Sequence, residues 1–213
     1  MSFQDQPTEH LQDVRHIKNM MERSSRFLSL SGFSGIAAGI CALAGAYVAH
    51  ELIFETYRKA METGSLSDGL YYKLRLYLIA LAAVVFSTAL VSAFYFTWKR
   101  TRRDGGLLWN AAARRLFWSV AIPVVAGGLF VLGMVWHEEW RFVAPASLFF
   151  YGLALVNASK YTLTDIRFLG ISEVILGFVN MFWIGYGLYF WAIGFGLLHI
   201  LYGIIMWYKY ERK

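Results

Sequence analysis

Residues 167–207 read RFLGISEVILGFVNMFWIGYGLYFWAIGFGLLHILYGIIMW. This stretch contains two apolar segments, 167–185 and 188–207, and a helix of about 20 residues is long enough to cross a bilayer. Glu173 and His199 are the only acidic or basic side chains well inside the long apolar runs of the chain. A charge at the centre of a membrane helix costs roughly 2.5–3.5 kcal/mol on insertion scales, so we expect each to have a partner within the protein.

The two segments form a predicted helical hairpin. If the turn lies at Tyr186 and Gly187, the antiparallel register brings Glu173 beside His199. The same register aligns small residues of the two helices, which allows membrane helices to approach closely. It predicts that Gly170 lies opposite Gly203 and that Gly177 lies opposite Gly196.

The Glu173–His199 pair has two interpretations. In the structural one, both side chains are neutral and clamp the hairpin by hydrogen bonding, because burial disfavours their charged forms. In the functional one, the pair handles protons or binds a ligand inside the bundle, with Asn180 and Asn157 as polar companions. We take the clamp as the default interpretation and the proton or ligand site as its alternative.

The composition indicates a lipid environment. Of the 213 residues, 58% are hydrophobic and 18% are aromatic, and the mean hydropathy is +0.46. A soluble domain of this size has too little interior to bury so much apolar surface. The net charge of +6 comes from basic residues between the apolar runs, which indicates membrane topology and contact with anionic lipid rather than nucleic-acid binding.

Six segments are long and apolar enough to form transmembrane helices. Their predicted ranges are 28–49, 74–97, 116–136, 141–159, 167–185 and 188–207. The first helix is expected to continue past the membrane, and the chain to turn between Gly64 and Gly69. Most of the 20 basic residues fall on one side of the predicted membrane, the side that holds both termini. Since basic residues are in excess on the cytoplasmic side, we expect both termini in the cytoplasm. The predicted fold is all-α, a six-helix transmembrane bundle over 28–207 followed by a cytoplasmic tail, 208–213.

Residues 1–27 form the predicted cytoplasmic segment before this domain. Apolar side chains recur at helical spacing through this segment and up to the first predicted span, at Leu11, Val14, Ile17, Met21 and Leu28. Charged residues occupy much of the rest, so we predict an amphipathic N-terminal helix on the lipid headgroups. A helix that docks on a membrane or cytoplasmic protein partner is the alternative.

Two predicted helices end at the outer face in His and carboxylate residues. These candidate metal ligands are His50, Glu51 and Glu55 in one helix and His137, Glu138 and Glu139 in the other. Such side chains bind divalent metals when they converge at one depth. Nothing in the sequence makes the two helices neighbours, so a hydrated acidic rim is the simpler interpretation.

Gly35 and Gly39 form a small-residue pair in the first predicted helix. Glycines four residues apart lie on one helix face and let another helix pack closely. We expect this face to pack inside the bundle or between the subunits of a homo-oligomer.

Two stretches carry a resemblance to known proteins. They are residues 157–170, which read NASKYTLTDIRFLG, and residues 185–199, which read GYGLYFWAIGFGLLH. With them the whole chain resembles a family of uncharacterised bacterial six-span membrane proteins, some of which carry the label of a carotene-cleaving monooxygenase. Membrane enzymes of that type resemble iron proteins with several histidines in the bundle, whereas this chain has His199 alone there. The resemblance implies the fold and the bacterial inner membrane, and it implies no catalytic residues.

Short loops and the lack of a catalytic motif favour a small-ligand-binding, sensing or regulatory membrane protein over an enzyme. The second hypothesis is a proton-coupled transporter or channel that uses Glu173 and His199. The third is a metal-dependent membrane enzyme. Membrane lipid is the expected partner, and the sequence does not identify a cofactor.

Overall fold

The computed structural model describes residues 26–64 and 67–212, and all regular secondary structure in these ranges is helical. The predicted all-α class is confirmed. The amphipathic helix predicted within residues 1–27 lies almost entirely outside the described residues. The elements are α2 (Gly32–Thr63), α3 (Asp68–Arg103), α4 (Ala111–Trp136), η1 (Trp140–Phe142), α5 (Val143–Ala158), α6 (Asp165–Phe182), η2 (Ile184–Tyr186), α7 (Gly187–Trp191), the π-helical η3 (Ala192–Leu198) and α8 (His199–Tyr210).

Local signals set the ends of the first two helices. α2 ends at Thr63, and the next residue, Gly64, has a φ of 72°, a left-handed conformation that glycine adopts without strain. Ser67 then caps α3 by accepting a hydrogen bond from the backbone N–H of Leu70 at 3.3 Å. The first helix therefore continues past its predicted span, as expected, but it begins at Gly32 rather than at residue 28.

The residues before α2 explain its late start. Phe27 is buried, and its N–H donates to the carbonyl of Tyr161 at 2.7 Å. Its own carbonyl accepts a hydrogen bond from Thr162 Oγ1 at 2.7 Å. Because these backbone groups are paired with the loop between α5 and α6, they are not free to form a first helical turn.

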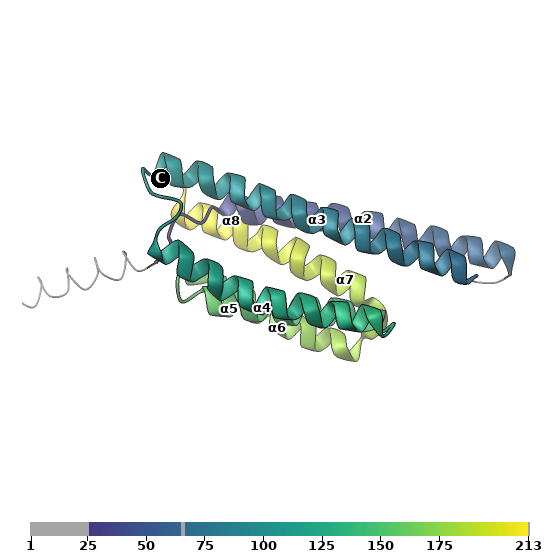
Figure 1. Ribbon diagram of the computed structural model, residues 1–213. Helices are drawn as coiled ribbons and strands as arrows, with labels where there is room; N and C mark the ends of the chain where they lie inside the picture. Colours follow the sequence, from purple (N-terminus) through teal and green to yellow (C-terminus); the bar gives the residue numbers. More distant parts are fainter. Residues whose placement is uncertain (1–25, 65–66, 213) are drawn as a thin grey trace, which may run out of the picture.

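The helices form two groups with the C-terminal helix between them (Figure 1). α2 and α3 lie side by side as one antiparallel pair, and α5 packs against both α4 and α6 in the second group. The C-terminal helix, built from α7, η3 and α8, contacts α2 on one side and α5 and α6 on the other. α3 and α4 are consecutive but do not pack closely against each other.

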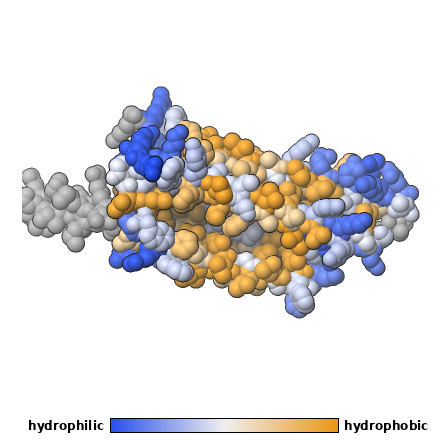
Figure 2. Space-filling view, turned by 45° about the horizontal axis from the view of Figure 1, so that its top comes forward, coloured by the Kyte–Doolittle hydropathy of each residue, from blue (hydrophilic) through white to orange (hydrophobic). Residues whose placement is uncertain are grey.

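The surface is compatible with a membrane protein. Within the described ranges, five helices are long and apolar enough to cross a membrane, and the last of them combines η2, α7, η3 and α8. α6 is not one of these five, and its 18 residues include the charged residues Asp165, Arg167 and Glu173. Figure 2 shows an apolar belt across the middle of one face, with hydrophilic residues gathered towards both ends. Exposed apolar surface of this extent is stable against lipid hydrocarbon rather than water.

The glycines of α6 and α8 pack helices, but not in the predicted pairs. A Cβ on Gly203 would lie 2.7 Å from the carbonyl oxygen of Gly32 in α2. A Cβ on Gly170 would lie 2.7 Å from the carbonyl oxygen of Gly152 in α5. The predicted facing of Gly170 with Gly203 is therefore wrong.

The remaining glycines follow the same division. Gly177 packs against Pro145 and Phe149 of α5, Gly196 packs against Leu43 of α2, and Gly35 and Gly39 pack against His199, Gly196 and Ile200 of the C-terminal helix. Gly177 thus does not face Gly196 either. The physical reason is that α2 and α5 offer small residues of their own, so the closest helix approaches form with them. The wider π turns of η3 also change the face that α8 presents compared with a straight α-helix.

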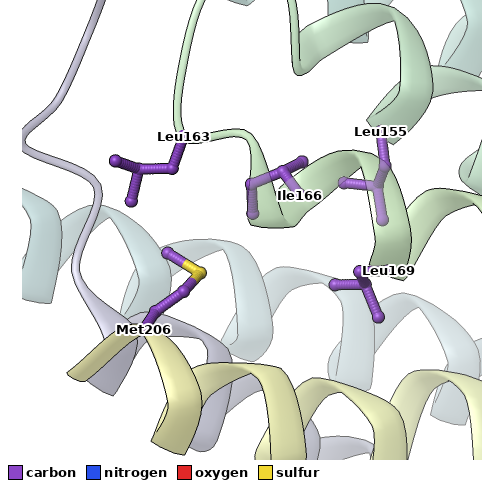
Figure 3. Close-up of a cluster of buried hydrophobic side chains, with 5 residues drawn as sticks. All are labelled: Leu155, Leu163, Ile166, Leu169 and Met206. Carbon is purple, nitrogen blue, oxygen red and sulfur yellow. The ribbon is translucent and has the colours of Figure 1, made fainter. Parts of the chain in front are cut away.

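One apolar cluster joins α8 to the second helix group (Figure 3). Leu155, Leu163, Ile166 and Leu169 come from α5, from α6 and from the loop between them, and Met206 comes from α8. All five side chains are buried. The cluster therefore holds α8 against α5 and α6, opposite its glycine contact with α2.

The C-terminal residues fold back onto the start of α2. The Glu211 side chain is 5% exposed and accepts hydrogen bonds from Ser31 Oγ and from the backbone N–H of Gly32. Arg100 Nη1 lies 3.3 Å from Glu211 Oε1 and also donates to the carbonyl of Leu30. We call this arrangement the Arg100–Glu211 clasp. It brings the start of α2, the end of α3 and the end of α8 to the same end of the bundle.

Candidate functional site

Glu173 and His199 lie together inside the bundle. Glu173, in the middle of α6, is 0% exposed, and His199, at the start of α8, is 6% exposed. Glu173 Oε1 is 3.5 Å from His199 Nδ1. The structure thus brings side by side the two residues that the predicted hairpin register paired.

Two other groups hold the His199 ring. Nδ1 lies 3.0 Å from the carbonyl oxygen of Gly194, and Nε2 lies 2.9 Å from the hydroxyl oxygen of Tyr151. Because a carbonyl oxygen only accepts, Nδ1 carries the proton that is donated to Gly194. In a neutral imidazole Nε2 then carries no proton, so it accepts a hydrogen bond from Tyr151.

The carboxyl group of Glu173 has no hydrogen-bond partner among the described residues. Both of its oxygens are buried, and a Cβ at Gly194 would come within 2.5 Å of Oε2. Glycine at position 194 is therefore what leaves room for this carboxyl group. A buried polar group without a partner costs about 1–3 kcal/mol, so Glu173 destabilises the fold unless another group pairs with it.

Gly194 lies within the π-helical segment η3. Short π segments inside α-helices are frequent at functional sites, because the wider turn changes the direction of side chains and carbonyl groups. Here the segment presents a carbonyl group to the His199 ring and a side-chain-free position to Glu173.

The two asparagines predicted as companions lie elsewhere. Asn157 Nδ2 donates to the carbonyl of Ser119 at 3.0 Å and joins α5 to α4. Asn180 lies about two helical turns from Glu173 on α6 and donates to the carbonyl of Trp183 at 3.1 Å. The structure brings neither side chain to the Glu173–His199 pair.

A cleft opens between α3 and α4 beside this pair. Its volume is about 330 Å³, and α5 and the C-terminal helix form its floor. In Figure 1 the C-terminal helix is visible between α3 and α4. The lining is almost wholly apolar and includes Ala42, Val85, Phe86, Val124, Gly128, Phe150, Tyr151, Trp191 and Phe195. Both the volume and the lining are typical of small-molecule sites.

Tyr151 belongs to both the cleft and the buried pair. It lines the cleft, and its hydroxyl group donates to His199. Phe195, another lining residue, packs against Tyr151 with 5.0 Å between ring centroids and stacks on His199 at 6.0 Å. A line of contacts therefore runs from the cleft through Tyr151 and His199 to Glu173.

Three of the candidate metal ligands pair with arginines. Glu55 lies 2.7 Å from Arg58, and Glu138 lies 2.7 Å from Arg75, whose hydrogen bond holds the pKa of Glu138 below its usual range. In the part of the chain that the structure describes, no three His, Cys, Asp or Glu side chains gather as a metal would require. Of the other candidates, His50 lies 3.7 Å from Glu51, Glu139 lies 3.0 Å from Arg141, and His137 follows the last residue of α4.

A second polar cluster links α6 and α8 at the end of the bundle that holds the clasp. Asp165 accepts hydrogen bonds from Lys209 Nζ at 3.1 Å and from the Tyr210 hydroxyl at 2.6 Å. Partial burial raises the pKa of Asp165, but the two hydrogen bonds and the charge of Lys209 outweigh it, so the pKa lies below its usual range. These contacts join the start of α6 to the end of α8.

Sequence reasoning missed Tyr151 as a member of the site. A signal was present, because Tyr151 lies in the middle of the predicted span 141–159, whereas tyrosines of membrane helices favour the interfaces. A buried tyrosine hydroxyl usually needs a hydrogen-bond partner. The partner lies on a different hairpin, and the sequence does not say which helices of a bundle are neighbours.

No protein-family model, curated protein or solved structure matches this chain. The resemblance to a bacterial six-span family therefore stays a prediction, carried by residues 157–170 and 185–199.

Proposed function

We propose that this chain is a multi-pass protein of the bacterial inner membrane that binds an apolar small molecule and acts as a sensor or regulator. The observation that carries the proposal is the cleft between α3 and α4, with its volume of about 330 Å³ and its apolar lining. A mostly apolar cavity with a few placed polar groups is the usual form of a small-molecule site. The polar groups here are Tyr151 and, behind it, His199 and Glu173.

The proposed topology has six crossings and two cytoplasmic termini. The five apolar helices support it, as does the close packing of α6 along α5. The clasp between Glu211 and the start of α2 also supports an even number of crossings, because it joins the first and last of these helices at one end. Arg102, Arg103 and Lys209 lie near that end, as the positive-inside rule requires of the cytoplasmic side.

The cleft suits an apolar molecule because its walls are incomplete. Phe86 on α3 is 59% exposed, and a Cβ on Gly128 of α4 would have nothing within 4 Å. Apolar cavities stay free of water and accept apolar guests. Membrane lipid, or a lipid-like small molecule, is therefore the partner we propose for this site.

Replacement of Gly128 by leucine tests the proposal. The new side chain projects into open space and fills part of the cleft without displacing backbone. Protein in lipid nanodiscs is labelled with a dodecane chain that carries a diazirine, and mass spectrometry locates the adducts. We expect the wild type to be labelled at cleft residues such as Phe86 and Phe150, and Gly128→Leu to lose most of this labelling.

Gly133→Leu is the matched control. Gly133 lies on the same helix, a Cβ there would also have nothing within 4 Å, and the residue does not line the cleft. This variant should be labelled like the wild type. Labelling spread evenly over the lipid-facing surface and unchanged in Gly128→Leu would contradict a binding site in the cleft.

A proton-coupled transporter is the second candidate, and the unpaired carboxyl group of Glu173 is the observation that favours it. Acidic side chains inside membrane bundles are common in proton relays, because a buried carboxyl can exchange a proton with a partner. If the protein is such a transporter, proteoliposomes that contain it should take up a solute in a proton-coupled way. The Glu173→Gln variant should lose this uptake.

A further inference from the structure

We infer that the molecule bound in the cleft carries a hydroxyl group and that Tyr151 recognises it. The inference rests on the proposed function and adds the chemical class of the ligand, an apolar chain that ends in an alcohol. It is carried by the hydrogen-bonding capacity that the described lining residues leave unused.

Two residues that line the cleft carry a hydroxyl group, and each hydroxyl already donates a hydrogen bond within the protein. Tyr151 donates to His199 Nε2 at 2.9 Å, and Ser147 donates to the carbonyl of Ala144 at 2.9 Å. A hydroxyl group has one proton and two lone pairs. The hydroxyl oxygens of these two residues can therefore accept a further hydrogen bond but cannot donate one.

His199 fixes this polarity at Tyr151. The ring cannot exchange its donor and acceptor sides, because Nδ1 faces the carbonyl oxygen of Gly194 at 3.0 Å and a carbonyl never donates. As long as the imidazole is neutral, Nε2 must accept from Tyr151. An apolar interior favours this neutral form, since an unpaired charge there is costly.

Trp191 also lines the cleft. The indole N–H of a tryptophan is a donor only. A ligand hydroxyl can donate to the Tyr151 oxygen and accept from a donor, so it uses both capacities. An ether or carbonyl oxygen only accepts, and leaves the accepting capacity of the Tyr151 oxygen unused. The remaining lining side chains are apolar and fit the chain of the ligand.

Competition between two matched molecules tests the inference. Nanodiscs with the wild-type protein are labelled with the diazirine-bearing dodecane in the presence of 1-dodecanol or of its methyl ether, 1-methoxydodecane. The two competitors share a twelve-carbon chain and differ in the hydrogen-bond donor. We expect the alcohol to protect the cleft at about fivefold lower concentration, the effect of one hydrogen bond. Equal protection by alcohol and ether in the wild type overturns the inference.

Two variants test which residue accepts the hydrogen bond from the alcohol. Tyr151→Phe removes the acceptor and should bring the two protecting concentrations together, while the hydrocarbon probe still labels the cleft of the folded protein. Ser147→Ala removes the other hydroxyl and should keep the preference for the alcohol. A preference lost in Ser147→Ala and kept in Tyr151→Phe would overturn the assignment to Tyr151. If Tyr151→Phe does not fold, the wild-type comparison still decides whether a hydroxyl is recognised.

The two proposals fail in different ways. If the hydrocarbon probe gives no adducts in the cleft, the proposed function fails and this inference fails with it. If the probe labels the cleft but alcohol and ether protect equally, the binding site stands and the recognition of a hydroxyl fails.

Discussion

Glu173 is the residue at which the clamp and the functional interpretation disagree. A clamp needs hydrogen bonds to the carboxyl group, and among the described residues both oxygens lack one. The His199 ring instead donates a hydrogen bond to the carbonyl of Gly194 and accepts one from the hydroxyl of Tyr151. The geometry therefore indicates that the carboxyl group of Glu173 lowers the stability of the fold rather than raising it.

We predict that Glu173→Met stabilises the protein. Methionine fills a similar volume without unpaired polar atoms, so the free energy of unfolding should rise by about 1–3 kcal/mol. Reversible unfolding in mixed detergent micelles measures it, and Glu173→Gln, which keeps the polarity, serves as the control with little change. A clear loss of stability in Glu173→Met would restore the clamp interpretation.

Only one of the contacts of this site could be predicted from the sequence. The proximity of Glu173 and His199 was predictable, because both lie in one hairpin and a turn of few residues fixes their depth. The contacts of His199 with Tyr151 and Gly194 were not, because one depends on which hairpin lies beside it and the other on a local π turn. The same reason separates Asn157 from the pair, since its partner is Ser119 on α4.

The helix against which α8 packs most closely, α2, determines how the bundle is arranged. Gly203 meets the backbone of α2 so closely that a Cβ would lie 2.7 Å from both the carbonyl oxygen of Gly32 and the N–H nitrogen of Ile36. Backbone atoms of a helix cannot move aside individually, so even one methyl group must push the two helices apart.

Gly203→Ala is therefore expected to destabilise the protein by about 1–3 kcal/mol, the usual cost of overpacking. Thermal unfolding in detergent, followed by circular dichroism, measures the change. Gly133→Ala is the control, because a Cβ there meets nothing within 4 Å and alanine is the better helix former. Equal melting temperatures for the two variants would contradict close packing of α8 on α2.

Small residues show that a helix packs closely, but they do not name its neighbour. The stripes around Gly35 and Gly39 in α2 and around Gly196 and Gly203 in the C-terminal helix were visible in the sequence. Their pairing with each other was not, because α2 and α8 are far apart in the chain and no hairpin turn fixes their register. The predicted ladder within the last hairpin failed for that reason.

For the whole molecule, the Arg100–Glu211 clasp joins three helix ends that no other described polar contact joins at once. The Arg100 side chain is 9% exposed and the Glu211 side chain 5% exposed, so each charge depends on the other. Removing one partner of a buried pair costs more than the pair contributes, because the other charge stays buried without compensation.

Glu211→Ala is predicted to lower the free energy of unfolding by about 3–5 kcal/mol. The adjacent Arg212→Ala, whose side chain is exposed, is the control and should change it little. Both are measured by unfolding in mixed micelles at one salt concentration. Similar effects of the two substitutions would mean that the clasp does not hold the bundle end together.

The class of fold, the apolar helices and most of their approximate ranges follow from apolar runs of helical length, which depend only on local sequence. The division into two helix groups does not, because it depends on contacts between distant segments. The cleft is a product of that division, since it exists where α3 and α4 separate.

The position of the cleft has a consequence for how its occupancy is controlled. It opens between α3 and α4, halfway along their apolar stretch. In the membrane setting proposed above, a guest would reach it sideways from the hydrocarbon phase. The quantity that sets occupancy is then the mole fraction of the guest in the membrane, and its solubility in water matters only through partitioning. With the proposed function, a protein of this shape would report on the composition of the membrane around it.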